Sequence, residues 1–229
     1  IIIGTVVLQS LTSGPLARWL GVQQRQPRGV LIIGANTVAR TLAHALVKQN
    51  IPVILTDNSW EYYRLARMEG LPAYYGNAWS EHAENFLDLS NTAQVLALSP
   101  NRHQNALAVY HFSHIFGNDK VFAIRSGSAL KGRGSNESAR FHRHEKLFPE
   151  DVTWSSLSSL LAKGATIKAT RLNENFGWME YLEKNRGVVP LFARLEEGKT
   201  VAINGKTTPT LPCTLIALVQ TDKSPASRR

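Results

Sequence analysis

Residues 29–57 read GVLIIGANTVARTLAHALVKQNIPVILTD, and this stretch decides the fold. Its first apolar run, residues 30–33, predicts a strand that is buried on both faces and ends at Gly34. Apolar residues at spacings of three and four then predict a helix over residues 38–47, and the next apolar run predicts a second strand leading to Asp57. A strand, a glycine turn, a helix and a strand with an acidic end form the β-α-β unit that binds a nucleotide in doubly wound folds.

The turn after the first predicted strand has the chemistry of a phosphate site. A phosphate needs unpaired backbone N–H groups, and the first turn of a helix supplies them together with a partial positive charge. Gly34 allows a tight turn, Ala39 occupies the last small position of the pattern G-x-G-x-x-G/A, and Asn36 stands at its second glycine. Asp57 is placed to accept hydrogen bonds from ribose hydroxyls. Two interpretations stay open, a nucleotide site or a unit that keeps this shape without a ligand.

The alternation of strands and helices continues after Asp57 and predicts an α/β fold, a doubly wound Rossmann-like parallel sheet with helices on both faces. Further strands are predicted over residues 71–75, 94–98 and 121–124. Ligands of such sheets bind outside the carboxyl ends of the strands, so we expect one crevice there. The expected cofactor-binding residues are Gly34, Ala35, Asn36, Thr37, Val38, Asp57, Asn58, Asn77, Ala78, Ser99 and Arg125.

Residues 151–222 form a different kind of sequence, which predicts a small α+β unit after the nucleotide-binding domain of residues 29–128. Its predicted helices cover residues 154–162 and 176–184, and its predicted strands cover residues 165–172, 188–195, 200–203 and 213–219. Asn204-Gly205 is a hairpin signal. The basic, Gly/Ser-rich residues 129–150 predict a linker, and the polar residues 223–229 predict a disordered tail.

Residues 1–28 begin with the uncharged sequence IIIGTVVLQSL. This run is shorter than the roughly 20 residues that a spanning helix needs. We expect it to be the end of a membrane helix, followed by a basic connector that carries Arg18, Arg25 and Arg28 and marks the cytoplasmic end. An ordinary core helix is the alternative, whereas a signal peptide would carry its charges before the apolar run.

Composition and motifs argue against several other classes of function. The hydrophobic content of 43% suits a globular chain, and the single cysteine, Cys213, excludes an internal disulfide. The net charge is +9, but basic residues cluster only modestly, within residues 131–146, so we expect no nucleic acid partner. His111 and His114 lie three apart on a predicted helix without a third ligand at a suitable spacing, so we predict no metal site. No Tyr-x-x-x-Lys pair supports a catalytic role, and we predict no enzyme.

The segments LIIGANTVA, VILTD, YYGNA, VLALSPN and VFAIRS follow one another within residues 29–126. In this order they resemble the N-terminal half of an RCK domain, the ligand-sensing module of potassium channels and transporters. The preceding TVVLQSLTSGPLARWLGV resembles the end of the last membrane helix of a bacterial cation:proton antiporter of the sodium/proton exchanger type. LFPEDVTWSSLSSLLAKGATIKATRL and VVPLFARLEEGK resemble the tail of such antiporters. Two residues depart from the family pattern, Asn36 in place of a glycine and Asn77 where an Asp is frequent.

The resemblance implies a regulatory domain at the cytoplasmic face of the bacterial inner membrane. It would control the exchange of Na⁺ or K⁺ for protons by binding NAD(H) or an adenine nucleotide, AMP, ADP or ATP. Its partners would be the transmembrane antiporter domain of the same chain and a second copy in a homodimer. The alternative is a soluble NAD-dependent oxidoreductase, which turnover of a substrate would distinguish.

Overall fold

The computed structural model describes residues 27–125, 147–149, 152–203 and 208–220, together with residues 6, 9, 11, 12 and 16. Most of the predicted membrane-helix end, connector and linker lies outside the described residues, as do Asn204-Gly205 and the predicted tail. Within the described part of the chain, no helix has both the length and the apolar character needed to cross a bilayer.

The first unit is a five-stranded parallel sheet with the strand order β3-β2-β1-β4-β5. The strands are β1 Gly29–Ile33, β2 Val53–Asp57, β3 Ala73–Tyr75, β4 Thr92–Ala97 and β5 Val121–Ala123. The helices between them are α2 Thr37–Lys48, α3 Trp60–Met68, α4 Glu81–Phe86 and α5 Arg102–Phe116. This arrangement confirms the predicted doubly wound α/β fold, and its chain order reverses between β1 and β4.

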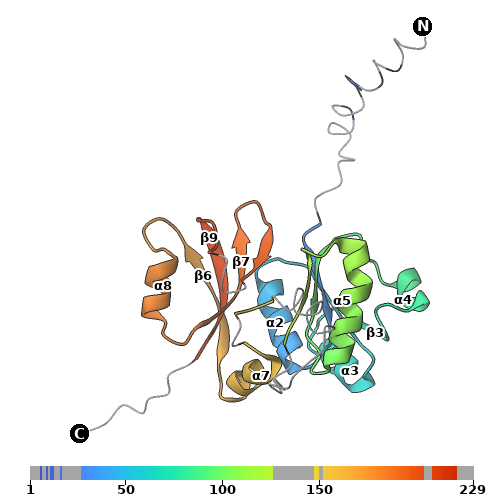
Figure 1. Cartoon of the computed structure of the whole chain (residues 1–229), viewed down its shortest axis with the longest axis horizontal. Helices are drawn as coiled ribbons and strands as arrows, with labels where there is room; N and C mark the ends of the chain where they lie inside the picture. The colour runs from blue at the N-terminus through green and yellow to red at the C-terminus, as the bar shows by residue number, and fades with distance from the viewer. Residues whose placement is uncertain are drawn as a thin grey trace, which may run out of the picture.

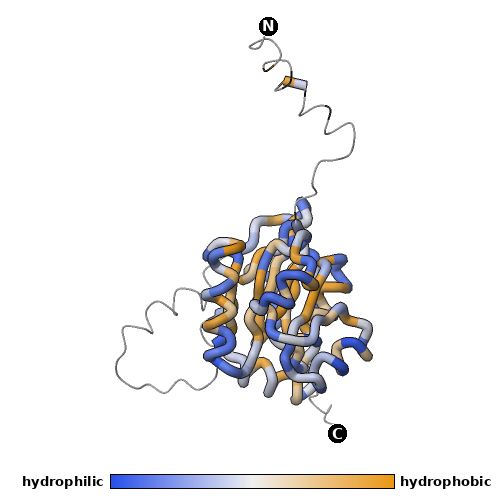
Figure 2. The backbone as a smooth tube through the Cα atoms, turned by 90° about the vertical axis from the view of Figure 1, so that its right-hand side faces the viewer, coloured by the Kyte–Doolittle hydropathy of each residue, from blue (hydrophilic) through white to orange (hydrophobic). Residues whose placement is uncertain are grey.

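The strands of this sheet are buried on both faces because helices cover both. Val30 and Ile32 of β1 pack into one apolar cluster with α2, whereas Leu31 and Ile33 pack into another with α4 and α5. Figure 2 shows the hydrophobic strands in the middle of the molecule and more hydrophilic segments outside them. Each helix of this unit begins after an Asn or Ser whose side chain accepts hydrogen bonds from its first turn.

The second unit is a four-stranded antiparallel sheet with the order β6-β9-β7-β8, and it lies beside the first unit in Figure 1. Its strands are β6 Thr166–Leu172, β7 Val189–Leu195, β8 Thr200–Ala202 and β9 Cys213–Val219, and its helices are α7 Trp154–Ala162 and α8 Trp178–Lys184. The α+β character of this unit is confirmed. β8 and β9 both pair with β7 and do not pair with each other, whereas Asn204-Gly205 itself lies outside the described residues.

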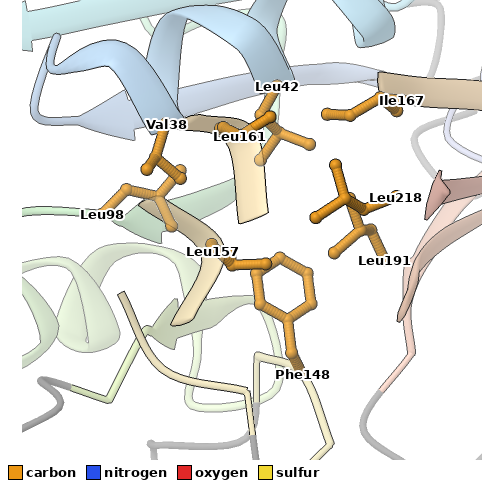
Figure 3. Close-up of a pocket in the computed structure, with 9 residues that line it drawn as sticks. All are labelled: Val38, Leu42, Leu98, Phe148, Leu157, Leu161, Ile167, Leu191 and Leu218. Carbon is orange, nitrogen blue, oxygen red and sulfur yellow. The ribbon is translucent and has the colours of Figure 1, made fainter. Parts of the chain in front are cut away.

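One apolar core joins the two units. Side chains of β1, α2 and β4 pack with those of α7, β7 and β9 in a single buried cluster. Figure 3 shows the point where they meet, around a cavity of about 10 Å³ whose described lining residues are all apolar. A cavity of this volume has room for about one water molecule at most, so the side chains of the two units are in direct contact.

Two buried acidic groups in the second unit predict a loss of stability at alkaline pH. Burial raises the pKa of the Cys213 thiol above its ordinary value of 9.0 and the pKa of the Tyr181 hydroxyl above 10.0. The unfolded chain therefore releases these protons at lower pH than the folded chain, so the free energy of unfolding falls as the pH rises above about 9. Urea unfolding at about pH 8 and pH 10 is expected to show a smaller loss for Cys213→Ala than for the parent chain. Equal losses in the two proteins would contradict this role of Cys213.

Candidate functional site

A hollow of about 280 Å³ opens at the carboxyl edge of the parallel sheet, where the chain order reverses. The ends of β1, β2 and β3 line it together with the residues that lead into α4 and the first turns of α5. Four of the predicted site residues line this hollow, namely Asp57, Asn58, Asn77 and Ala78. The other predicted residues lie around it or further along the same edge.

The start of α5 contributes a wall that the sequence-based prediction missed. Asn101, His103, Gln104 and Leu107 line the hollow, as does Trp79 after β3. The cap signal of Asn101 was visible in the sequence. Only the spatial order of the strands, with β4 next to β1, places this helix start opposite Asp57.

Asp57 holds the turn after β1 and the start of α3 together. Its Oδ2 accepts a hydrogen bond from the Ala35 N–H at 2.7 Å, and its Oδ1 accepts one from the Ser59 N–H at 2.9 Å. The residue is only 8% exposed. A carboxylate offers about four acceptor positions, so these two contacts leave capacity for hydroxyl donors from the hollow.

Gly34 has the left-handed backbone that the turn requires, with a φ of +106°. A Cβ at this position would lie 3.2 Å from the Asn36 side chain and 3.4 Å from the backbone of Leu98, so little room is left for any other residue. The Gly34 N–H donates to the Thr56 carbonyl at 2.7 Å, which fixes the turn against β2.

Asn36 fills the turn with its own side chain. Its Oδ1 accepts from the N–H groups of Val38 and Ala39, and its Nδ2 donates to the Leu98 carbonyl at 2.8 Å. In the described structure the backbone N–H groups of Asn36 and Thr37 donate no hydrogen bond. These two groups remain available to an anion at the start of α2.

Trp154, the first residue of α7, lies against the same turn. Its indole Nε1 donates to Asn36 Oδ1 at 3.3 Å, and its backbone N–H donates to the Arg125 carbonyl at 2.8 Å. The two partners of the indole contact are 118 positions apart in the sequence. The second unit therefore begins in contact with Asn36, the residue that caps α2.

Arg125 and Ser99 shape the surroundings of the hollow and do not line it. The Arg125 guanidinium donates to the carbonyls of Phe148, Pro149 and Val152, which ties the end of β5 to the segment before α7. The Ser99 hydroxyl donates to Gln104 Oε1 at 2.6 Å, which orients a side chain that does line the hollow.

The histidines of α5 have aromatic neighbours. The ring of His111 lies edge-on to Phe112, and the ring of His114 lies edge-on to Tyr110. Over the residues that the structure describes, no group of three or more His, Cys, Asp or Glu side chains is arranged to hold a metal ion.

Among known protein families, one family model matches part of the chain. Residues 30–129 match the family model of the TrkA-N domain. No curated protein matches the chain.

Three of the similar solved structures illustrate the likeness. The NAD(P)-binding domain of an exopolyphosphatase-related protein from Archaeoglobus fulgidus is 21% identical, with a TM-score of 0.42, over 60% of this chain and 95% of that one. The TrkA-N domain of the inner membrane protein ybaL from Escherichia coli is 20% identical, with a TM-score of 0.35, over 52% of this chain and 96% of that one. The GsuK channel bound to NAD is 14% identical, with a TM-score of 0.40, over 96% of this chain and 43% of that one. The segment from residue 30 to residue 129, which carries the hollow and the turn after β1, is the part of the chain that is similar to a TrkA-N domain.

Proposed function

We propose that this chain is the nucleotide-binding regulatory part of a bacterial antiporter that exchanges Na⁺ or K⁺ for protons. NAD(H) or an adenine nucleotide binds at the carboxyl edge of the parallel sheet. The observation that carries the proposal is the hollow of about 280 Å³ that brings Asp57, Asn77 and the start of α5 together beside the α2 turn. The antiporter assignment rests on the sequence resemblance, and the TrkA-N domain supports it.

The volume of the hollow suits one nucleoside. Ligand pockets commonly measure about 300–1,000 Å³, so about 280 Å³ accommodates an adenosine and leaves a longer ligand to extend outward. Asp57 would accept from the ribose hydroxyls, and the side chains of Asn58, Asn77 and Gln104 offer donors and acceptors to a base. The phosphates would then extend toward the N–H groups of Asn36 and Thr37.

Regulation requires a ligand that distinguishes two arrangements of the protein. Trp154 supplies a contact that phosphates over the α2 turn would change, because its indole Nε1 donates to Asn36 Oδ1 and would donate to a phosphate oxygen instead. A bound nucleotide would then favour an arrangement in which α7 has shifted relative to the turn. The second unit would pass this change to a transmembrane domain of the same chain.

The proposal includes a homodimer. The outward side of α5 exposes Tyr110 and Ile115, whose side chains are a suitable surface for a second copy. The assembly would lie at the cytoplasmic face of the inner membrane.

A thermal-shift screen against NAD, NADH, AMP, ADP and ATP tests ligand binding, because a ligand of the folded state raises the melting temperature. Sodium sulfate at matched ionic strength is the control for a general anion effect. Proton flux by the full-length protein in vesicles, with and without the nucleotide that binds, tests regulation. If no nucleotide raises the melting temperature, or if a bound nucleotide leaves the flux unchanged, the corresponding part of the proposal is wrong.

Trp154→Phe is expected to lower the affinity for AMP about three- to tenfold, because the indole N–H that would donate to the phosphate is removed while an aromatic ring is kept. The affinity for adenosine, which has no phosphate, should stay the same. Calorimetric titration of both proteins with both ligands measures this difference. An equal change for AMP and adenosine would show that Trp154 acts on the nucleoside and not on the phosphate turn.

A further inference from the structure

A row of polar side chains crosses three strands of the second sheet. Arg171 on β6 pairs with Thr214 on β9, and Thr214 pairs with Arg194 on β7. Residues paired across antiparallel strands project from the same face of a sheet. Two guanidinium groups therefore stand on either side of one threonine hydroxyl.

A hollow of about 320 Å³ lies over this row. Because neighbouring strands are about 4.8 Å apart, the Cα atoms of the two arginines are separated by about 10 Å, which leaves space for one anion between their side chains. Like charges placed close together on one sheet face are unfavourable unless an anion neutralises them. The row therefore has both the room and the electrostatic reason to hold an anion.

Among the residues that the structure describes, Glu196 is the only acid that lines this hollow. Its Oε1 lies 2.8 Å from Arg171 Nη2, but both side chains are well exposed, at 60% and 70%. An exposed ion pair contributes little free energy, so a better anion can displace Glu196. Arg194 is only partly exposed, and within the described chain no hydrogen bond or ion pair is made by its guanidinium.

The row lies far from the nucleotide crevice, on the side where the chain enters β1. Gly198, in the turn directly after Arg194 and Glu196, packs against the guanidinium of Arg28, whose atoms would lie 3.0 Å from a Cβ at that glycine. Arg28 precedes β1, so this turn is at the amino ends of the parallel strands, whereas the crevice is at their carboxyl ends. In Figure 1 the turn between β7 and β8 is at the top of the molecule, and α3 and α7 are at the bottom.

We propose that Arg171, Thr214 and Arg194 form an anion site that binds a phosphate group. Guanidinium groups bind phosphate oxygens through paired charge-assisted hydrogen bonds, and the threonine hydroxyl adds a donor between them. The phosphate is either that of a small molecule in solution or that of a lipid headgroup. This site is independent of the nucleotide proposal, because it shares no residue with the crevice.

Calorimetric titration of the 229-residue chain with inorganic phosphate tests the site. The double variant Arg171→Gln/Arg194→Gln is expected to lose affinity about tenfold or more, since each arginine supplies charged hydrogen bonds. The matched control Lys168→Gln/Arg186→Gln removes the same charge from exposed positions of the same unit and should stay within about twofold of the parent, because distant exposed charges are screened. Equal affinities in the two double variants would overturn the proposal.

Glu196→Gln is expected to gain phosphate affinity, a result that a folding defect would not produce. Releasing Arg171 from its intramolecular partner should raise the phosphate affinity about threefold, in line with the small free energy of an exposed ion pair. Unchanged or weaker binding by this variant would contradict the proposal.

Co-sedimentation with vesicles of phosphatidylglycerol or phosphatidylcholine distinguishes the two sources of phosphate. Binding to phosphatidylglycerol that the Arg171→Gln/Arg194→Gln variant loses and the control variant keeps would assign the site to a lipid headgroup. Arginine-dependent binding of inorganic phosphate without vesicle binding would assign it to a soluble phosphate.

Discussion

Replacing Asp57 with alanine is expected to lower the free energy of unfolding by about 2–4 kcal/mol and to abolish nucleotide binding. The substitution leaves the N–H groups of Ala35 and Ser59 without their acceptors, at a position that is almost fully buried. It also removes the group that would accept from the ribose. We expect stability and binding to be lost together, because the same carboxylate accepts a hydrogen bond from the turn after β1 and lines the hollow.

Asp88→Ala is the matched control for Asp57→Ala. Asp88 also accepts a hydrogen bond from the N–H two residues later, that of Ser90, and hydrogen bonds from the Ser90 side chain and then from this N–H lower the pKa of its carboxyl. Asp88 is exposed and lies outside the residues that line the hollow, so its loss should change neither property much. Urea unfolding and calorimetric titration with AMP measure the two effects. Similar results for the two variants would show that the buried contacts of Asp57 are not important.

The second large effect is expected for Phe192→Ala, which should cost about 3–5 kcal/mol of stability. Phe192 is fully buried in the core that joins the two units, and its ring lies edge-on to Phe148 with centroids 5.7 Å apart. Removing the ring leaves a cavity between the sheets. Because both units depend on this core, we expect the whole chain to unfold in one transition at a lower urea concentration.

Phe86→Ala serves as the control for Phe192→Ala, because Phe86 is 71% exposed on α4 and its removal opens no cavity in the core. Far-ultraviolet circular dichroism and tryptophan fluorescence should report the same midpoint for each protein. Two separate transitions in Phe192→Ala, with the first unit as stable as in the parent chain, would mean that the units do not support each other.

Local signals were enough to predict the β1-α2-β2 unit. A buried apolar run, a glycine and a helix with one apolar face each depend on nearby residues only, and β1, α2 and β2 form where the sequence indicated. The position of Asp57 beside the phosphate turn follows from the parallel pairing of β1 with β2.

Contacts between distant parts of the chain could not be predicted in this way. Nothing near Asn36 indicates that Trp154 donates to its side chain, because that contact depends on where α7 packs. At Asn204-Gly205 a local turn signal favoured a hairpin, but strand pairing with β7 determined the sheet order. The row of Arg171, Thr214 and Arg194 likewise exists only through the register of three strands.

Calorimetric titration of the 229-residue chain with AMP and with adenosine is the most direct test of the central claim, that an adenine nucleotide binds with its phosphate over the α2 turn. We predict saturable binding of one AMP per chain and about tenfold weaker binding of adenosine, because the start of α2 offers free N–H groups and a positive dipole to the phosphate. Asp57→Ala should bind neither ligand. The absence of saturable binding for AMP, ADP, ATP, NAD and NADH would contradict the claim and would leave a Rossmann-like unit that keeps its fold without a nucleotide.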